Sequence, residues 1–135
     1  MKIERILIVG LGSAGSKHLQ ILKMLFPLAD IRALSSKSGE KFTDKINSFF
    51  KDINDALLFK PNFALISSPS SEHIKISKIF AENKIHLFIE KPISNRTNQV
   101  SEFLKLCKKN GVKIHVAYNL RYMNSLIFFK NCLKD

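Results

Sequence analysis

Apolar residues along this chain fall into two patterns, short continuous runs and longer stretches with helical spacing. Runs of β-branched and aliphatic residues bounded by Gly, Pro or Ser predict buried strands. These strands are expected at 6–9, 30–34, 63–67, 85–89 and 112–118, with a brief one at 49–50. Helical spacing predicts a helix after Ser13 and others at 39–47, 53–59, 74–82, 99–109 and 125–133. This alternation predicts an α/β Rossmann fold, a doubly wound, mostly parallel sheet with helices on both faces.

Polar and helix-breaking residues set the expected ends of these elements. Pro27 ends the first helix, because proline cannot continue a helix. Asp52, Ser70 or Ser71, and Ser94 are the expected N-caps of the next three well-bounded helices. The strand at 112–118 alternates more than the others, which is typical of a position nearer the edge of a sheet.

A glycine turn joins the first strand to the first helix, with the spacing Gly10-x-Gly12-x-x-Gly15. In this context Gly10 allows a tight reversal, Gly12 lets backbone approach a diphosphate, and Gly15 lets the helix pack closely on the strand. The N–H groups of the first helical turn, which contains Ser13 and Ala14, favour an anion. The turn therefore predicts a dinucleotide site, although a strand-to-helix turn without a ligand has the same spacing.

The second strand ends in hydroxyl groups and a lysine, Ser35, Ser36 and Lys37, with no carboxylate among them. An NAD-selective fold usually offers an acid here to the ribose 2′-hydroxyl. The absence of an acid favours NADP as the coenzyme, although NAD is not excluded. The alternative to a coenzyme site is a solvated loop that happens to be polar.

Two later strands also end in polar residues, and the carboxyl ends of parallel strands are where ligands bind in such sheets. Ser67, Ser68 and Pro69 form an expected cofactor wall, with His73 as either a polar contact or a plain surface residue. Glu90 and Lys91 follow the next strand. A lysine in a desolvated cleft beside a nicotinamide suits proton transfer near neutral pH. The alternative is a surface charge pair.

The bulk composition narrows the class of protein. The 135 residues carry a formal net charge of +11, but the lysines are spread over the polar faces of expected helices. This distribution predicts no specific nucleic-acid site, since basic residues are not interleaved with aromatics. No apolar run reaches membrane length and no signal peptide is expected. Cys107 and Cys132 lack metal-type spacing, so no metal site and a reducing, cytoplasmic location are expected.

The order of these motifs resembles the N-terminal half of the Gfo/Idh/MocA oxidoreductases, relatives of glucose-fructose oxidoreductase and inositol dehydrogenase. The matching motifs are Gly10-Leu11-Gly12-Ser13-Ala14-Gly15 followed by His18, Ser68-Pro69 followed by His73, Glu90-Lys91-Pro92, and Tyr118-Asn119-Leu120-Arg121-Tyr122. The resemblance implies that Glu90 binds the nicotinamide ribose and that Lys91 is a catalytic residue beside the nicotinamide. It also implies that Arg121 reaches the substrate or braces the domain junction.

Members of that family continue into a second α/β domain that carries most of the substrate site. The resemblance therefore divides this chain into a dinucleotide-binding domain at 1–120 and the start of a truncated second domain at 121–135. The family chemistry is hydride transfer between a nicotinamide and a secondary hydroxyl of a sugar or cyclitol. We therefore expect these 135 residues to bind the coenzyme and to be incomplete for catalysis by themselves. His86 and His115 lie in expected strands and are assigned to packing rather than catalysis.

Three other functions remain as alternatives. The chain could be a catalytically incomplete nucleotide-binding module that acts with a partner chain, or with a second copy, through its apolar C-terminal helix. Nucleic-acid binding through the net charge is poorly supported, because any strongly basic protein binds DNA at low salt. A methyltransferase shares the glycine turn, but Glu90-Lys91-Pro92 has no role in that chemistry.

Overall fold

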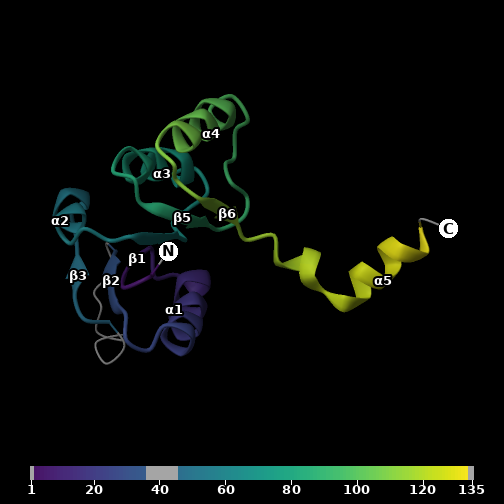
Figure 1. Cartoon of the computed structure of the whole chain (residues 1–135), viewed down its shortest axis with the longest axis horizontal. Helices are drawn as coiled ribbons and strands as arrows, with labels where there is room; N and C mark the ends of the chain where they lie inside the picture. Colours follow the sequence, from purple (N-terminus) through teal and green to yellow (C-terminus); the bar gives the residue numbers. More distant parts are fainter. Residues whose placement is uncertain (1, 36–45, 134–135) are drawn as a thin grey trace.

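A six-stranded parallel sheet forms the centre of the molecule (Figure 1). The computed structural model describes residues 2–35 and 46–133. The strands are β1 (Arg5–Val9), β2 (Asp30–Leu34), β3 (Phe49–Phe50), β4 (Phe63–Ile66), β5 (His86–Ile89) and β6 (Ile114–Val116). Their order is β3-β2-β1-β4-β5-β6, which is the strand order of a Rossmann fold. The expected doubly wound sheet is confirmed, and β6 lies at its edge as predicted.

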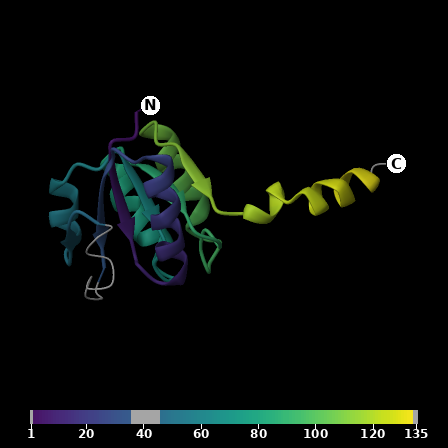
Figure 2. The ribbon, with the colours of Figure 1, turned by 90° about the horizontal axis from the view of Figure 1, so that it is seen from below.

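Helices cover both faces of this sheet (Figure 2). Helix α1 (Ser13–Leu25) lies on one face, where Leu19 and Leu22 pack against Ile6 and Ile8 of β1. The other face carries α2 (Ile53–Leu58), α3 (His73–Glu82) and α4 (Val100–Lys109). Their buried side chains pack against the alternate strand residues; this core cluster includes Leu7, Val9, Ala64, Ile66, Ala56, Phe80 and Phe103. Because strand side chains alternate between faces, one buried strand serves both layers.

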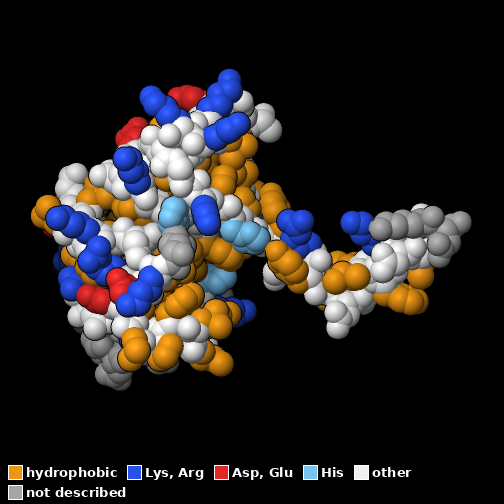
Figure 3. Space-filling model, in the orientation of Figure 1, with side chains coloured by type: hydrophobic (Ala, Val, Ile, Leu, Met, Phe, Trp, Pro, Cys, Tyr) orange, Lys and Arg blue, Asp and Glu red, His pale blue; other side chains and the backbone are white. Residues whose placement is uncertain are grey.

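The last two elements leave the sheet. A short 3-10 helix, η2 (Asn119–Tyr122), and α5 (Asn124–Cys132) extend away from the domain in both ribbon views (Figures 1 and 2). Neither contains a buried residue. Figure 3 shows hydrophobic side chains along this extension together with Lys and Arg, and further Lys and Arg spread over the visible face of the domain. None of the helices in the described residues is long and apolar enough to span a membrane.

The helix starts show where capping was predicted correctly and where it was not. Asp52 caps α2 as expected, since its side chain accepts a hydrogen bond from the Asn54 N–H at 2.7 Å. The prediction of Ser70 or Ser71 as a cap is wrong: a turn closed by Glu72 N–H to the Pro69 carbonyl delays the start of α3, and Glu72 is its N-cap.

The prediction of Ser94 as a cap is also wrong, because Ser94 accepts a hydrogen bond from Arg96 N–H and α4 begins at Val100 after Gln99. The helix expected at 39–47 falls largely on 36–45, outside the described residues, and Asn47 is a bend rather than helix.

Candidate functional site

A cleft of about 810 Å³ opens at the carboxyl ends of β1, β2 and β4. Six of the predicted cofactor residues line it: Gly10, Gly12, Ser35, Ser67, Ser68 and Pro69. Four charged residues that the sequence patterns did not single out for this site also line it: Lys51, Asp52, Glu72 and Lys75. The cleft lies where open α/β sheets bind dinucleotides, so its position agrees with the prediction from the glycine turn.

Each glycine of the turn has the geometry that the motif requires. Gly10 has a φ of +87°, and a Cβ there would lie 2.9 Å from the Ser67 carbonyl oxygen. A Cβ on Gly15 would lie 2.1 Å from the Gly10 carbonyl oxygen, so α1 packs against the turn at a distance only glycine allows. A Cβ on Gly12 would meet no described protein atom within 4 Å. Gly12 therefore leaves open space for a ligand, while Gly10 and Gly15 are needed by the fold itself.

The residues at the end of β4 divide their roles between fold and cleft. Ser67 Oγ lies 3.0 Å from the Val9 carbonyl and 2.7 Å from the Gly10 carbonyl, so its hydroxyl pins the glycine turn to β4. The buried Ser68 Oγ has no hydrogen-bond partner among the described residues. An unpartnered hydroxyl on the wall of the cleft is available to a polar ligand.

The residues present fit a dinucleotide. Helix α1 starts at the cleft with Gly12 as an N-cap that has no side-chain hydrogen bond. The N–H groups of the first helical turn, Ser13 to Gly15, have no intrahelical acceptor, and here no side-chain cap satisfies them either, so they form a natural site for a diphosphate. Gly12 provides the space and Ser68 the spare hydroxyl. These residues would hold the diphosphate and the adjoining ribose.

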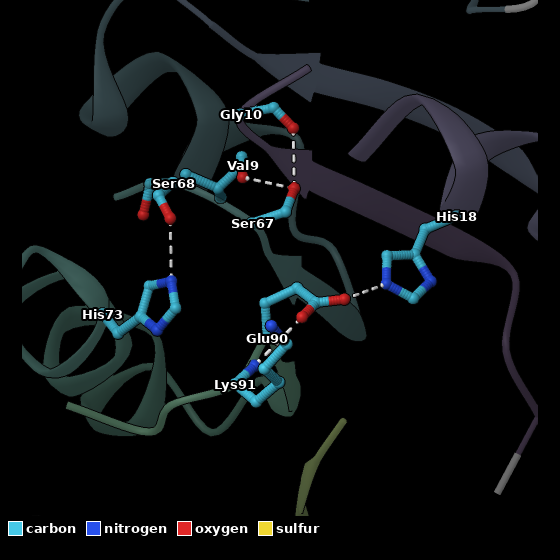
Figure 4. Close-up of polar contacts among 8 residues, drawn as sticks. All are labelled: Val9, Gly10, His18, Ser67, Ser68, His73, Glu90 and Lys91. Carbon is cyan, nitrogen blue, oxygen red and sulfur yellow. Dashed lines mark hydrogen bonds and ion pairs between the residues drawn. The ribbon is translucent and has the colours of Figure 1, made fainter. Parts of the chain in front are cut away.

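Glu90 is held by a side chain of α1 and by the backbone of the next residue (Figure 4). His18 Nε2 on α1 lies 2.6 Å from Glu90 Oε1, and the Lys91 N–H donates to Glu90 Oε2 at 3.0 Å. Both side chains of the His18–Glu90 pair are largely buried, at 21% and 17% exposed. The carboxylate thus pairs with His18 and with backbone. The alternative interpretation, a surface charge pair between Glu90 and Lys91, therefore does not agree with the structure.

His73 is buried, with 1% of its surface exposed. Its Nδ1 lies 2.8 Å from the Pro92 carbonyl oxygen and its Nε2 lies 2.8 Å from the Ser68 carbonyl oxygen. The reading of His73 as a surface residue of a first helical turn is therefore wrong. Its ring connects the loop after β4 to the turn after β5, beside Lys91.

The remaining predicted residues lie outside the cleft lining or outside the described chain. Lys91 is exposed at the end of β5, so the described residues alone do not provide the desolvated surroundings expected for it. Arg121 is exposed on η2 with its guanidinium 5.8 Å from the centre of the Tyr122 ring. Ser36 and Lys37 lie outside the described residues. The structure thus brings the glycine turn, the serines and Glu90 to one edge of the sheet and leaves Arg121 apart.

Two histidines in strands have packing roles, as expected. The His115 ring stacks on Phe88 at 5.4 Å between ring centres, and Phe88 also meets the edge of the His18 ring. His86 Nδ1 accepts a hydrogen bond from the Lys113 N–H at 3.1 Å. Burial lowers the pKa of His86, and the positive charge of Lys113 adds to that effect.

Comparison with known proteins identifies the family. Residues 4–118 match the model of the Gfo/Idh/MocA oxidoreductase family, described as an NAD-binding Rossmann fold. An uncharacterized oxidoreductase, YrbE of Bacillus subtilis, is 32% identical over 122 residues, which are 85% of this chain and 35% of the relative. Myo-inositol 2-dehydrogenase of Thermotoga maritima is 28% identical over 143 residues, 97% of this chain and 41% of the relative. The chain therefore spans about two fifths of the length of these relatives.

Solved structures show the same fold. Scyllo-inositol dehydrogenase of Lactobacillus casei, solved with NAD(H) and scyllo-inositol, has a TM-score of 0.84 at 23% identity, over 98% of this chain and 41% of its own. The WlbA dehydrogenase of Bordetella pertussis, solved with NADH and UDP-GlcNAcA, has a TM-score of 0.87 at 19% identity, over 98% of this chain and 42% of its own. With the glycine turn, the cleft and the family match in agreement, this chain belongs to the Gfo/Idh/MocA oxidoreductase family and forms its NAD-binding Rossmann-fold domain.

Proposed function

We propose that this chain binds a nicotinamide dinucleotide for hydride transfer to or from a secondary hydroxyl of a sugar or cyclitol. The observation that carries the proposal is the open space at Gly12 beside the first turn of α1, with the spare Ser68 hydroxyl on the same cleft. Relatives named as inositol dehydrogenases support the substrate class. The substrate itself is left to residues beyond those described, because the family places most of its substrate contacts in a second domain.

The chain's own residues have separate tasks in this proposal. When bound, the nicotinamide supplies the hydride chemistry. The α1 N-terminus holds the diphosphate, and Glu90, fixed by His18, accepts hydrogen bonds from the nicotinamide ribose. Lys91 takes the hydroxyl proton as the carbon loses hydride and returns it in the reverse direction. Because Lys91 is exposed here, a covering domain or partner has to exclude water from this step.

For the coenzyme, we propose a preference for NADP over NAD. Ser35 lines the cleft where β2 ends, and the next two residues in sequence are Ser36 and Lys37. Lys51 lines the same cleft and adds positive charge there. Asp52 is a carboxylate on this wall, but one of its oxygens is already occupied by the α2 cap. Hydroxyls and lysines suit a 2′-phosphate better than a bare ribose hydroxyl.

The second candidate is an incomplete module that needs another chain for turnover. It is supported by the apolar residues that η2 and α5 expose, among them Leu120, Leu126, Ile127, Phe128 and Phe129. An exposed apolar surface of this kind marks a docking face. In either case residues 1–120 form the dinucleotide domain and 121–135 begin a second unit. The two free cysteines, Cys107 and Cys132, support a reducing, cytoplasmic location.

Titration of the chain with NADH, NAD⁺, NADPH and NADP⁺ tests the proposal. We expect saturable binding and a rise in thermal stability, since a ligand of the native state stabilises it. Gly12→Val should abolish binding and leave the unfolding transition unchanged, because its Cβ enters open space. Absence of binding by all four coenzymes would overturn the proposal. Turnover of a polyol by this chain alone would favour the enzyme over the incomplete module.

A further inference from the structure

The His73 ring faces two acceptors. The carbonyl oxygens of Ser68 and Pro92 each lie 2.8 Å from one of its nitrogens, and the ring is buried at the start of α3. Figure 4 shows the ring directed at the Ser68 backbone, close to the Glu90–Lys91 turn. Ser68 belongs to the loop after β4, and Pro92 to the turn after β5. One side chain therefore connects two of the segments that carry the candidate site.

A carbonyl oxygen only accepts hydrogen bonds, and a neutral imidazole has a single N–H. The neutral ring of His73 can satisfy one of the two carbonyls and presents a lone pair to the other. The doubly protonated ring donates to both. Among the described residues, no carboxylate oxygen is within ion-pair distance of this ring to favour the second proton independently. The doubly protonated ring therefore differs from the neutral ring in bonding both carbonyl oxygens instead of one.

We propose that His73 is a positioning residue whose second proton ties the Ser68 loop to the Lys91-Pro92 turn, aligning the cofactor wall with Lys91. With a neutral ring, one of the two segments is released. The alignment of Lys91 rests on the proposed function, whereas the coupling of the ring to the two loops does not. Coenzyme affinity should rise as the ring gains its second proton, by about tenfold for the loss or gain of one charged hydrogen bond.

The charged groups around His73 lie on the neighbouring elements. They are Glu72, which caps α3, Lys75 and Lys78 on α3, Glu90 and Lys91 after β5, and Arg96 and Glu102 before and within α4. The three carboxylates among them have ion-pair partners of their own. Glu72 pairs with Lys75, Lys78 with Glu102, and Glu90 with His18. Of these partners, His18 is itself an imidazole in contact with Glu90, so the experiment has to separate it from His73.

The experiment follows the ring and the coenzyme together. NADH is the probe, because it lacks a 2′-phosphate that would titrate itself. The NADH dissociation constant and the ¹⁵N signals of each histidine ring are measured between about pH 5 and 8. We expect affinity to strengthen toward low pH with the midpoint of His73. In a His18→Gln background, whose amide keeps the donor to Glu90 without titrating, that dependence should persist.

Two variants separate the two hydrogen bonds of the His73 ring. The amide nitrogen of His73→Asn replaces Nδ1 and retains the Pro92 contact, whereas that of His73→Gln replaces Nε2 and retains the Ser68 contact. Both should weaken NADH about tenfold relative to the protonated wild type and remove the His73-dependent pH profile. An unchanged profile in both variants, or a midpoint that follows His18, would overturn the proposal.

The wild-type spectra keep the inference testable without variants or coenzyme. If the variants fail to fold, or if NADH does not bind, the backbone amide signals of Ser68 and Lys91 are followed through the His73 titration. We expect both loops to shift at that midpoint. Backbone amide signals that do not change as His73 gains its second proton would refute the coupling between the ring and the two loops. Loss of NADH binding with coupled signals would refute only the proposed function.

Discussion

His18 of α1 and Glu90, the residue that follows β5, are joined by a 2.6 Å contact between Nε2 and Oε1, although they are 72 residues apart in sequence. The second carboxylate oxygen is held by the Lys91 N–H at 3.0 Å (Figure 4). One carboxylate therefore connects the helix that carries the glycine turn to the segment that carries Lys91. This contact fixes Glu90 before any ligand arrives, and preorganisation of this kind lowers the cost of binding.

A double-mutant cycle measures that contact. Removing the donor with His18→Asn or the charge with Glu90→Gln should each destabilise the fold, with a coupling free energy of about 1 kcal/mol for this partly buried pair. His18→Gln, which retains a donor at the Nε2 position, should recover most of the loss. Urea unfolding of the four proteins gives the coupling. Strictly additive losses would show that the contact contributes nothing to stability.

The glycines of the turn should separate binding from folding. Gly15→Ala places its Cβ 2.1 Å from a backbone carbonyl oxygen, so we expect a loss of about 3 kcal/mol or more. Gly12→Val should leave the free energy of unfolding within about 0.5 kcal/mol of wild type and remove coenzyme binding. Thermal and urea unfolding of the two variants check this contrast. Equal destabilisation by both would mean that Gly12 is needed by the fold rather than by a ligand.

The strand pattern and the glycine spacing predicted the sheet and the position of the cleft, because both depend on local sequence. Runs such as 63–66 are apolar on both faces, which is typical of a buried parallel strand. The roles of His18 and His73 could not be derived in the same way. His18 bonds to Glu90 from an element 72 residues away in sequence, and His73 bonds to carbonyls that carry no side-chain signal. Contacts to backbone and across long separations leave no periodic pattern.

The charged lining of the cleft was also missed for a physical reason. Lys51 and Asp52 follow the two-residue strand β3, and their approach to β2 depends on a crossover rather than on sequence proximity. The wrong caps, Ser70 or Ser71 for α3 and Ser94 for α4, arise because serine hydroxyls favour turns as strongly as helix starts. The position of β3 beside β2 would have been needed to place Lys51 and Asp52 in the cleft. Local turn geometry would have been needed to avoid the wrong serine caps.

His86 should make stability depend on pH. Its pKa is lowered in the folded state, chiefly by burial, so the unfolded chain binds the proton more readily. The contribution of neutral His86 to the free energy of unfolding is therefore complete above the pKa of His86 in the unfolded chain. It is lost as the pH falls through the pKa of His86 in the folded chain. His86→Asn, whose side-chain oxygen can still accept from the Lys113 N–H, should reduce the loss of stability between about pH 7 and 5. Urea midpoints across this range provide the measurement; parallel pH curves for the two proteins would contradict it.

Coenzyme choice should respond to charge at the end of β2. Ser35→Asp places a carboxylate where an NAD-selective fold has its acid, so it should repel a 2′-phosphate and offer an acceptor to the ribose hydroxyls. We expect the ratio of NADPH to NADH dissociation constants to rise about tenfold, the effect of ~1.4 kcal/mol. Ser35→Asn is the uncharged control. A ratio that moves equally in both variants would mean that shape rather than charge decides.

Helix α5 should behave as a docking element rather than as part of the domain. Phe128 and Phe129 are 71% and 59% exposed, and no residue of α5 is buried. We expect the sedimentation coefficient of the chain to rise with concentration, and Phe128→Ser with Phe129→Ser to suppress that rise. The double variant should leave the unfolding transition within about 0.5 kcal/mol of wild type, since neither ring packs on the sheet. Leu28→Ser, at an apolar position that is 99% exposed after α1, is the matched control. A chain that sediments as a monomer at every concentration would show that α5 needs a different partner, and a large loss of stability in the double variant would show that it packs on its own domain.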